Sequence, residues 1–162
     1  MNIISDGENV TGAASGMAKE KLKIRIRRVD LDLISYEHDI TVMQNDCLPG
    51  IYGYLDDSLH GYWWIAFDGE IPVGYLGLVH TSGFWYLCNC GVIKNYRGHG
   101  IMKRMIYVML KHARNIGIKT IYTDTNENPA SANSLIHCGF RMFLPKKIWA
   151  YQHSQYWKYR LQ

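Results

Sequence analysis

The chain has 162 residues, of which 48% are hydrophobic and 20% charged, so it is long enough to bury one sizeable core and too short for two comfortable domains. Its formal net charge of +4 suits an anionic ligand but falls short of the dense basic surface that indicates nucleic-acid binding. No apolar run approaches the roughly 20 residues of a membrane-spanning helix, and the N-terminus lacks the features of a secretory signal. We therefore expect a cytoplasmic protein that binds neither membrane nor nucleic acid.

Residues 1–21 are rich in Gly, Ala, Ser and Asn and show no hydrophobic period, which indicates a flexible N-terminal extension. Residues 22–162 carry the periodic pattern and are expected to form a single domain. The cysteines lack ligand-spaced histidines and a second close pair, so we expect reduced, mostly buried thiols and no metal site. They are Cys47, Cys88, Cys90 and Cys138.

The first elements of the domain are a strand and a helix. Residues 22–27 alternate between aliphatic and basic side chains, which predicts a half-buried strand. Asp30 can cap a helix that is only weakly amphipathic and extends to about Asn45. Residues 51–61 are expected to follow as a loop or a short helix.

A hairpin comes next in the chain. Residues 62–67 and 73–80 are strand-like runs, and the Asp68-Gly69 step between them is a strong turn signal. A second turn at residues 81–83 leads into a further strand over residues 84–92. The three strands are therefore expected to be neighbours in an antiparallel arrangement.

Residues 101–116 place their apolar side chains on one helical stripe, which predicts a helix packed on the core. The stripe comprises Ile101, Met102, Met105, Ile106, Met109, Leu110, Ala113 and Ile116. Gly117 ends this helix and residues 119–125 form another strand, so the order of strand, helix and strand implies a right-handed crossover between parallel strands. Asn128 begins a shorter helix to about Cys138, and residues 140–161 contain two more strands.

The loop before the long helix reads NYRGHGIMKRMI, from Asn95 to Ile106. A glycine-rich turn between a strand and a helix leaves backbone N–H groups unpaired at the helix N-terminus, where the helix dipole favours an anion. Gly98 and Gly100 allow a close backbone approach. The segment matches neither a P-loop nor a dinucleotide-binding turn. On spacing alone, an anion site and a plain tight turn both remain open.

Two segments resemble one known family. Residues 92–102, VIKNYRGHGIM, look like the acetyl-coenzyme A signature of the GNAT superfamily of N-acetyltransferases, and residues 128–140, NPASANSLIHCGF, are similar to its second motif. The order of strands agrees over residues 22–161. The resemblance implies a three-layer α/β (α+β) fold with a central mixed, mostly antiparallel twisted sheet of six to seven strands, flanked by about four helices.

The resemblance also implies acetyl-CoA as the cofactor, with CoA as product. The free backbone of the strand before the loop would pair with the pantetheine amides, and Gly91 would fit a bulge there. N–H groups of the loop would cradle the pyrophosphate, with Lys103 and Arg104 near its charge, and Met102 stands where the family usually has Gly or Ala, which we expect to weaken binding at worst. The implied cofactor residues are Cys90, Gly91, Val92, Arg97, Gly98, His99, Gly100, Ile101, Met102, Lys103, Asn128 and Ser131.

The customary catalytic groups of the family are missing from this chain. Its usual base positions fall on Tyr86 and Thr123, and its usual acid position falls on Leu135. Three interpretations stay open. A substitute set acts, or a low-pKa amine needs only orientation beside the thioester, which we favour, or the domain binds acyl-CoA without turning it over. The substitute candidates are Tyr86, Tyr156, Asp124 and His80.

The acceptor pocket is expected from residues 47–62 and 145–157, in which aromatic side chains could hold a cation or a peptide. Trp63 and Trp157 are expected in the core instead. The other candidates are Tyr52, Tyr54, Trp64, Trp149, Tyr151 and Tyr156, with Asp56 and Asp57 attracting a positive group. The chain is thus predicted to be an acetyl-CoA-dependent N-acetyltransferase, monomeric or homodimeric, in which a primary amine of a small molecule, peptide or protein attacks directly in a ternary complex. The alternative is a non-catalytic acyl-CoA sensor or scaffold.

Overall fold

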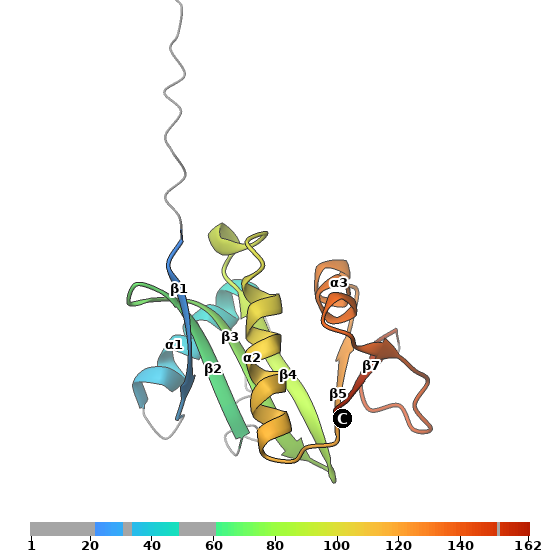
Figure 1. Cartoon of the computed structure of the whole chain (residues 1–162). Helices are drawn as coiled ribbons and strands as arrows, with labels where there is room; N and C mark the ends of the chain where they lie inside the picture. Colours follow the sequence, from blue (N-terminus) through green and yellow to red (C-terminus); the bar gives the residue numbers. More distant parts are fainter. Residues whose placement is uncertain (1–21, 31–33, 49–60, 152) are drawn as a thin grey trace, which may run out of the picture.

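The computed structural model describes residues 22–30, 34–48, 61–151 and 153–162 (Figure 1). The predicted extension over residues 1–21 lies outside the described residues. So do four of the residues predicted to shape the acceptor pocket, namely Tyr52, Tyr54, Asp56 and Asp57.

Within the described residues, seven strands form one sheet in the order β1-β2-β3-β4-β5-β7-β6. Only β4 and β5 pair in parallel, and every other neighbouring pair is antiparallel. The sheet is therefore mixed and mostly antiparallel, as predicted. The strands are β1 (Ile24–Val29), β2 (Gly61–Asp68), β3 (Ile71–Thr81), β4 (Phe84–Val92), β5 (Thr120–Thr125), β6 (Arg141–Met142) and β7 (Gln155–Arg160).

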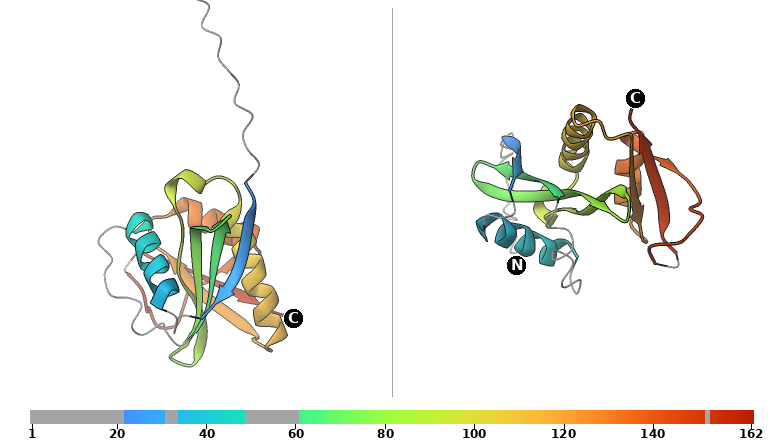
Figure 2. Two further views of the ribbon diagram at one scale, coloured as in Figure 1. Left: turned by 90° about the vertical axis from the view of Figure 1, so that its left-hand side faces the viewer. Right: turned by 90° about the horizontal axis from the view of Figure 1, so that it is seen from below.

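The described residues contain three α-helices and a short 3-10 helix, where the sequence predicts about four helices. They are α1 (Ile34–Cys47), η1 (Lys94–Tyr96), α2 (Ile101–Asn115) and α3 (Pro129–His137). One face of the sheet is covered by α1 and the opposite face by α2, which gives the three layers of the fold (Figure 2). Within the described parts of the chain, no helix is long and apolar enough to cross a membrane.

Each face of the sheet has its own buried core. On one face, Ile40 and Met43 of α1 pack against β2 and β3, where Trp63 is fully buried. On the other face, the apolar stripe of α2 packs with Leu135 and Phe140 of the α3 segment. Trp157 is also buried there, so the prediction that Trp63 and Trp157 are core residues is confirmed.

One detail of the helix predictions is wrong. Ile116 was placed on the buried stripe, but α2 ends at Asn115 and the side chain of Ile116 is 42% exposed, because Gly117 turns the chain away with a φ of 79°. The predicted helix cap at Asp30 falls beside residues 31–33, which lie outside the described residues.

The bulge in β4 lies before Gly91. The pairing of β3 with β4 shifts by one residue between Tyr75 and Gly77, and Asn89 has a φ of 37°. Gly91 itself pairs regularly with Tyr75, so the prediction of a bulge at Gly91 is wrong. A Cβ atom there would lie 2.7 Å from the Cys47 sulfur and 2.8 Å from a Tyr75 ring carbon. This glycine is required because α1 packs directly on β4.

Candidate active site

The parallel strands β4 and β5 part from each other after a short contact. They pair only where Trp85 and Tyr86 face β5. One residue further along β4, the hydroxyl of Thr123 donates to the Leu87 carbonyl oxygen at 2.8 Å. Beyond this contact, the edge of β4 facing β5 has no strand partner within the described residues. It can therefore hydrogen-bond an extended ligand as an added strand would.

A groove of about 440 Å³ opens between β4, the glycine loop and α3. All of the predicted cofactor residues except His99 line it. Sequence reasoning missed the contribution of α1, which comes from a segment more than forty positions away in the chain. The lining residues are Cys47, Leu48, Cys90, Gly91, Val92, Tyr96, Arg97, Gly98, Gly100, Ile101, Met102, Lys103, Asn128, Ala130, Ser131 and Ser134.

The glycine loop ends in an uncapped helix N-terminus. Gly98 and Gly100 adopt φ angles of 79° and 71°, a region that only glycine enters without strain. The Arg104 N–H donates to the Gly100 carbonyl oxygen, which is the first bond of α2, and no side chain among the described residues caps the helix. The N–H groups of residues 101–103 therefore have no partner within the helix, and they lie at the groove. Such a terminus favours an anion.

The cations near the loop differ in their positions. Lys103 lines the groove. Arg104 does not face it, because its guanidinium donates to the Ile24 carbonyl oxygen of β1 at 3.0 Å. The exposed His99 turns back on the loop, with Nδ1 2.9 Å from the Arg97 carbonyl oxygen. Lys103 is thus the predicted cation that remains available to a bound anion.

Arg97 folds back along β4. Its Nε donates to the Val92 carbonyl oxygen at 2.9 Å, so it engages a carbonyl group that was predicted to pair with pantetheine. Burial raises the pKa of the Cys47 thiol, and a hydrogen bond from Arg97 together with its positive charge opposes that rise. Arg97 therefore bridges α1 and β4 at the groove wall.

Of three further predicted cofactor residues, Met102 lies on α2, and Asn128 and Ser131 lie at the start of α3. Met102 is half-buried, lines the groove and also packs on the core beneath α2, so its side chain has an apolar place to turn. Asn128 is the N-cap of α3, and its Oδ1 accepts a hydrogen bond from the Ser131 N–H at 3.0 Å. Both Asn128 and Ser131 line the groove.

The candidate catalytic residues gather beside the point where β4 and β5 part. The hydroxyl of Tyr86 donates to the Asp124 carboxylate. Asp124 is directly opposite Tyr156 on β7, and the Tyr156 hydroxyl accepts a hydrogen bond from the Ala150 N–H at 3.3 Å. Burial, and then the charge of Asp124, raise the pKa of Tyr86, so its hydroxyl stays protonated. The exposed His80 instead packs on Trp85.

The customary positions of the family are occupied by buried groups. Thr123 is buried and its hydroxyl is engaged with β4. Leu135 is 4% exposed and belongs to the core. Neither side chain can transfer a proton in this setting.

An aromatic cluster surrounds the Asp124 side of the sheet. Trp149 lies at its centre, with a ring centroid 4.6 Å from that of Tyr156. In the segment before Trp149, the side chain of Leu144 is 95% exposed. The other rings of the cluster, linked by centroid distances of 5.5 to 6.3 Å, are Phe84, Tyr86, Tyr122 and Phe143.

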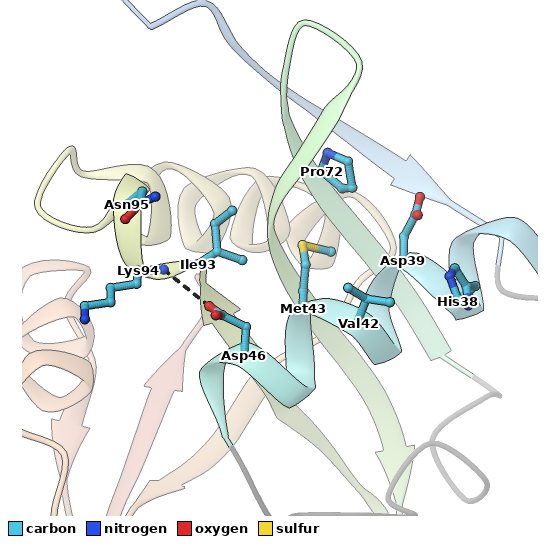
Figure 3. Close-up of a pocket in the computed structure, with 9 residues that line it drawn as sticks. All are labelled: His38, Asp39, Val42, Met43, Asp46, Pro72, Ile93, Lys94 and Asn95. Carbon is cyan, nitrogen blue, oxygen red and sulfur yellow. Dashed lines mark hydrogen bonds between the residues drawn. The ribbon is translucent and has the colours of Figure 1, made fainter.

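A second hollow of about 490 Å³ lies on the other side of η1, between α1 and the start of β3 (Figure 3). No sequence pattern predicted it. In its wall, the Lys94 N–H donates to the Asp46 carboxylate at 3.4 Å and so joins η1 to the end of α1. The lining residues are His38, Asp39, Val42, Met43, Asp46, Pro72, Ile93, Lys94 and Asn95.

Comparison with known proteins identifies the family to which this architecture belongs. The sequence profile of the acetyltransferase (GNAT) family matches residues 31–140. The chain belongs to the GNAT acetyltransferase family. No curated protein matches this GNAT acetyltransferase in sequence.

Solved structures share the GNAT fold at low sequence identity. The aminoglycoside 6'-acetyltransferase type Ii is similar with a TM-score of 0.69 and 17% identity, over 84% of this chain and 96% of that one. The IAA acetyltransferase from Bacillus cereus is similar with a TM-score of 0.68 and 17% identity, over 85% of this chain and 99% of that one. A chain of the NatC complex bound to Gag peptide and CoA is similar with a TM-score of 0.68 and 19% identity, over 86% of this chain and 99% of that one. These likenesses support the fold.

Proposed function

We propose that this GNAT acetyltransferase is an acetyl-CoA-dependent N-acetyltransferase that acts by direct attack of an amine in a ternary complex. The observation that carries the proposal is the parting of β4 from β5. Beyond the parting, a groove runs to the N-terminus of α2, which suits an anion, and the Tyr86 hydroxyl donates to the Asp124 carboxylate beside the point where the two strands part.

The groove fits the cofactor by the chemistry of its lining. Backbone N–H groups of residues 101–103 and the Lys103 ammonium suit the pyrophosphate, and the free edge of β4 suits the two pantetheine amides. Asn128 and Ser131 form the facing wall. The neighbouring NatC structure is described as bound to CoA, which supports the same ligand here. When bound, acetyl-CoA supplies the activated acetyl group.

The chain contributes orientation first and proton handling second. Holding an amine beside a bound thioester supplies most of the barrier reduction that such a transfer needs. Tyr86 keeps its proton, because burial and the Asp124 charge raise its pKa. Asp124 is the carboxylate that can accept the amine proton, while the Tyr86 hydroxyl can donate toward a departing thiolate. This pair takes the place of the groups missing at Thr123 and Leu135.

The acceptor is proposed to carry a primary amine on a small molecule, a peptide or a protein. The aromatic cluster centred on Trp149 borders Asp124, and aromatic faces with a nearby carboxylate suit a cationic amine. Two structural neighbours support this range, since one is named for an aminoglycoside and another is bound to a Gag peptide. We propose a monomer or a homodimer.

A second candidate function rests on the same site. Thr123 and Leu135 are buried where the family usually carries its proton-transfer groups. A chain without those groups would still hold acyl-CoA in the groove and act as a sensor or scaffold.

One experiment separates the two functions. Calorimetric titration of acetyl-CoA is followed, in the same samples, by release of free CoA thiol with a panel of polyamines, aminoglycosides and short peptides. Thiol release with one acceptor class establishes the transferase and its substrate type. Binding without release from any acceptor favours the sensor, and an absence of binding contradicts both.

A further inference from the structure

Two thiols that the transfer reaction does not use line the cofactor groove. Cys47 is the last residue of α1, and Cys90 lies on β4. The Cys47 sulfur packs directly over the backbone of Gly91, where a Cβ atom would lie only 2.7 Å from it. Cys47 therefore borders the residue next to Cys90 in the groove wall, although the two cysteines are 43 positions apart in the sequence.

On β4, this stretch lies toward the point where β4 and β5 part. Of the β4 residues that line the groove, Cys90 is the furthest along the strand from Gly98 and Gly100. With its pyrophosphate at the loop, CoA would extend its pantetheine arm toward Cys47 and Cys90. The free thiol of CoA is at the tip of that arm, so the groove directs one thiol toward two others.

The two protein thiols differ in their readiness to react. Burial, followed by the charge of Cys47, raises the pKa of Cys90 to about 11. Burial also raises the pKa of Cys47, but there the hydrogen bond and the charge of Arg97 act in the opposite direction. The thiolate is the attacking form in thiol–disulfide exchange. Cys47 is therefore the better nucleophile of the pair.

We propose that Cys47 is a modification site at which CoA disulfide attaches as a mixed disulfide, an inference that rests on the proposed cofactor groove. The Cys47 thiolate attacks one sulfur of CoA disulfide, and the original S–S bond breaks. A new S–S bond joins Cys47 to one CoA, while the second CoA leaves as a thiolate and takes up the proton that Cys47 released. Binding in the groove raises the local concentration of the disulfide next to Cys47.

The modification has a direct consequence for the transferase. A CoA joined to Cys47 occupies the groove, so acetyl-CoA cannot enter until a thiol reductant removes it. The binding of acetyl-CoA thus becomes dependent on the thiol–disulfide state of the surrounding CoA pool.

The test uses the full chain, CoA disulfide, and intact-mass analysis followed by peptide mapping. We expect one CoA adduct, on Cys47, which dithiothreitol removes. Adduct formation with CoA disulfide should be faster than with glutathione disulfide at equal concentration by about tenfold or more, because only CoA disulfide binds in the groove before it reacts. Excess acetyl-CoA should slow it. Cys47→Ser should lose the adduct, whereas Cys138→Ser, at a buried thiol outside the groove lining, should keep it.

Several results would overturn the assignment. An adduct mapped to Cys88 or Cys138, an equal rate with glutathione disulfide, or no protection by acetyl-CoA would each do so. Calorimetry of the untreated protein separates this inference from the proposed function. Acetyl-CoA binding without any adduct on Cys47 overturns the inference alone, while an absence of acetyl-CoA binding overturns both. Peptide mapping of the parent protein after reaction with CoA disulfide identifies the modified cysteine even if the Cys47→Ser variant fails to fold.

Discussion

The hydroxyl of Tyr86 on β4 donates a hydrogen bond to the carboxylate of Asp124 on β5. The two strands pair in parallel at Tyr86 and separate one residue later, so this contact lies beside the point where they part. Each residue alone is an ordinary polar group on a strand. Together they place a proton donor and a carboxylate where an acceptor amine is proposed to attack.

The first prediction concerns this pair. Tyr86→Phe and Asp124→Asn should each lower kcat by about 10²-fold, the lower end of general acid–base contributions, without changing the Kd of acetyl-CoA. The double variant should cost little more than either single one, because the two groups act as a unit. Steady-state thiol release and calorimetry measure the two quantities.

A control variant for this prediction is Tyr107→Phe. The Tyr107 hydroxyl donates to the His137 carbonyl oxygen at 3.2 Å, outside the groove, so its loss removes one hydrogen-bonded tyrosine hydroxyl without touching the site. Its kcat should stay within about twofold of the parent value. If Tyr86→Phe behaves in the same way as Tyr107→Phe, orientation alone accounts for catalysis.

The second prediction concerns the glycine loop. Gly100→Glu should abolish acetyl-CoA binding, because it puts a negative side chain at the helix N-terminus that is proposed to bind the pyrophosphate. Calorimetry measures the effect. Gly117→Glu is the matched control, since Gly117 has a similar φ of 79° and open space around it at the other end of α2.

Both glycine variants should lose a similar amount of stability, roughly 1 to 2 kcal/mol, because a side chain is strained at positive φ. Only the first should lose the cofactor. Equal affinity for acetyl-CoA in the two variants would remove the loop from the cofactor site.

The third prediction concerns Leu135, which occupies the usual acid position of the family. Leu135→Tyr should destabilise the protein by about 1 to 3 kcal/mol without raising kcat, because the side chain is buried in the core and has no room for a phenol ring. Leu135→Met, which nearly conserves volume, should cost less than about 1.5 kcal/mol. Urea unfolding measures both. A gain in turnover from Leu135→Tyr would mean that this position still opens to the groove.

The fourth prediction concerns the pH dependence of stability. His112 packs edge-on against Tyr62 and Trp64, with ring centroids 4.5 and 5.5 Å away. Burial, followed by the charge of Arg28, lowers the pKa of His112 from its ordinary value of 6.5. The unfolded chain therefore binds more protons than the folded chain below pH 6.5, so this contribution to stability is complete above 6.5 and declines as the pH falls.

His112→Phe keeps an aromatic ring in the same position but removes the titration. The free energy of unfolding, measured with urea from pH 5 to pH 8, should fall less steeply on acidification in the variant than in the parent. The remaining histidines are common to both proteins, so the difference between the two curves isolates His112. Parallel curves would contradict the assigned pKa direction.

The local patterns of the chain were sufficient for most of the architecture. The strand over residues 84–92, the stripe of residues 101–113 and the two glycines of the loop each depend on near neighbours, and each has the predicted structure. The prediction that Ile116 is buried was wrong, because hydrophobic periodicity alone does not show where a helix ends. The prediction of a bulge at Gly91 was wrong, because glycine is needed there for the packing of α1 on β4, and the sequence of the strand does not reveal that packing.

In the candidate site, too, some parts follow from local sequence motifs and others depend on tertiary packing. The glycine loop and the N-cap at Asn128 are local motifs, and the sequence located both. The roles of Arg97 and Cys47 were not visible, because they depend on packing the end of α1 against β4. The hydrogen bond between Tyr86 and Asp124 joins residues 38 positions apart, and only the parallel register of β4 and β5 brings them together.

By itself, the sequence determined the family, the order of strands and helices, and the segment that forms the glycine loop, because hydrophobic period, turn residues and short motifs are all set by residues close together in the chain. The tertiary structure alone decided where β4 and β5 separate, which carbonyl group Arg97 engages and which thiols face the groove. These features depend on register and on packing between distant segments, and no local pattern in the sequence specifies them.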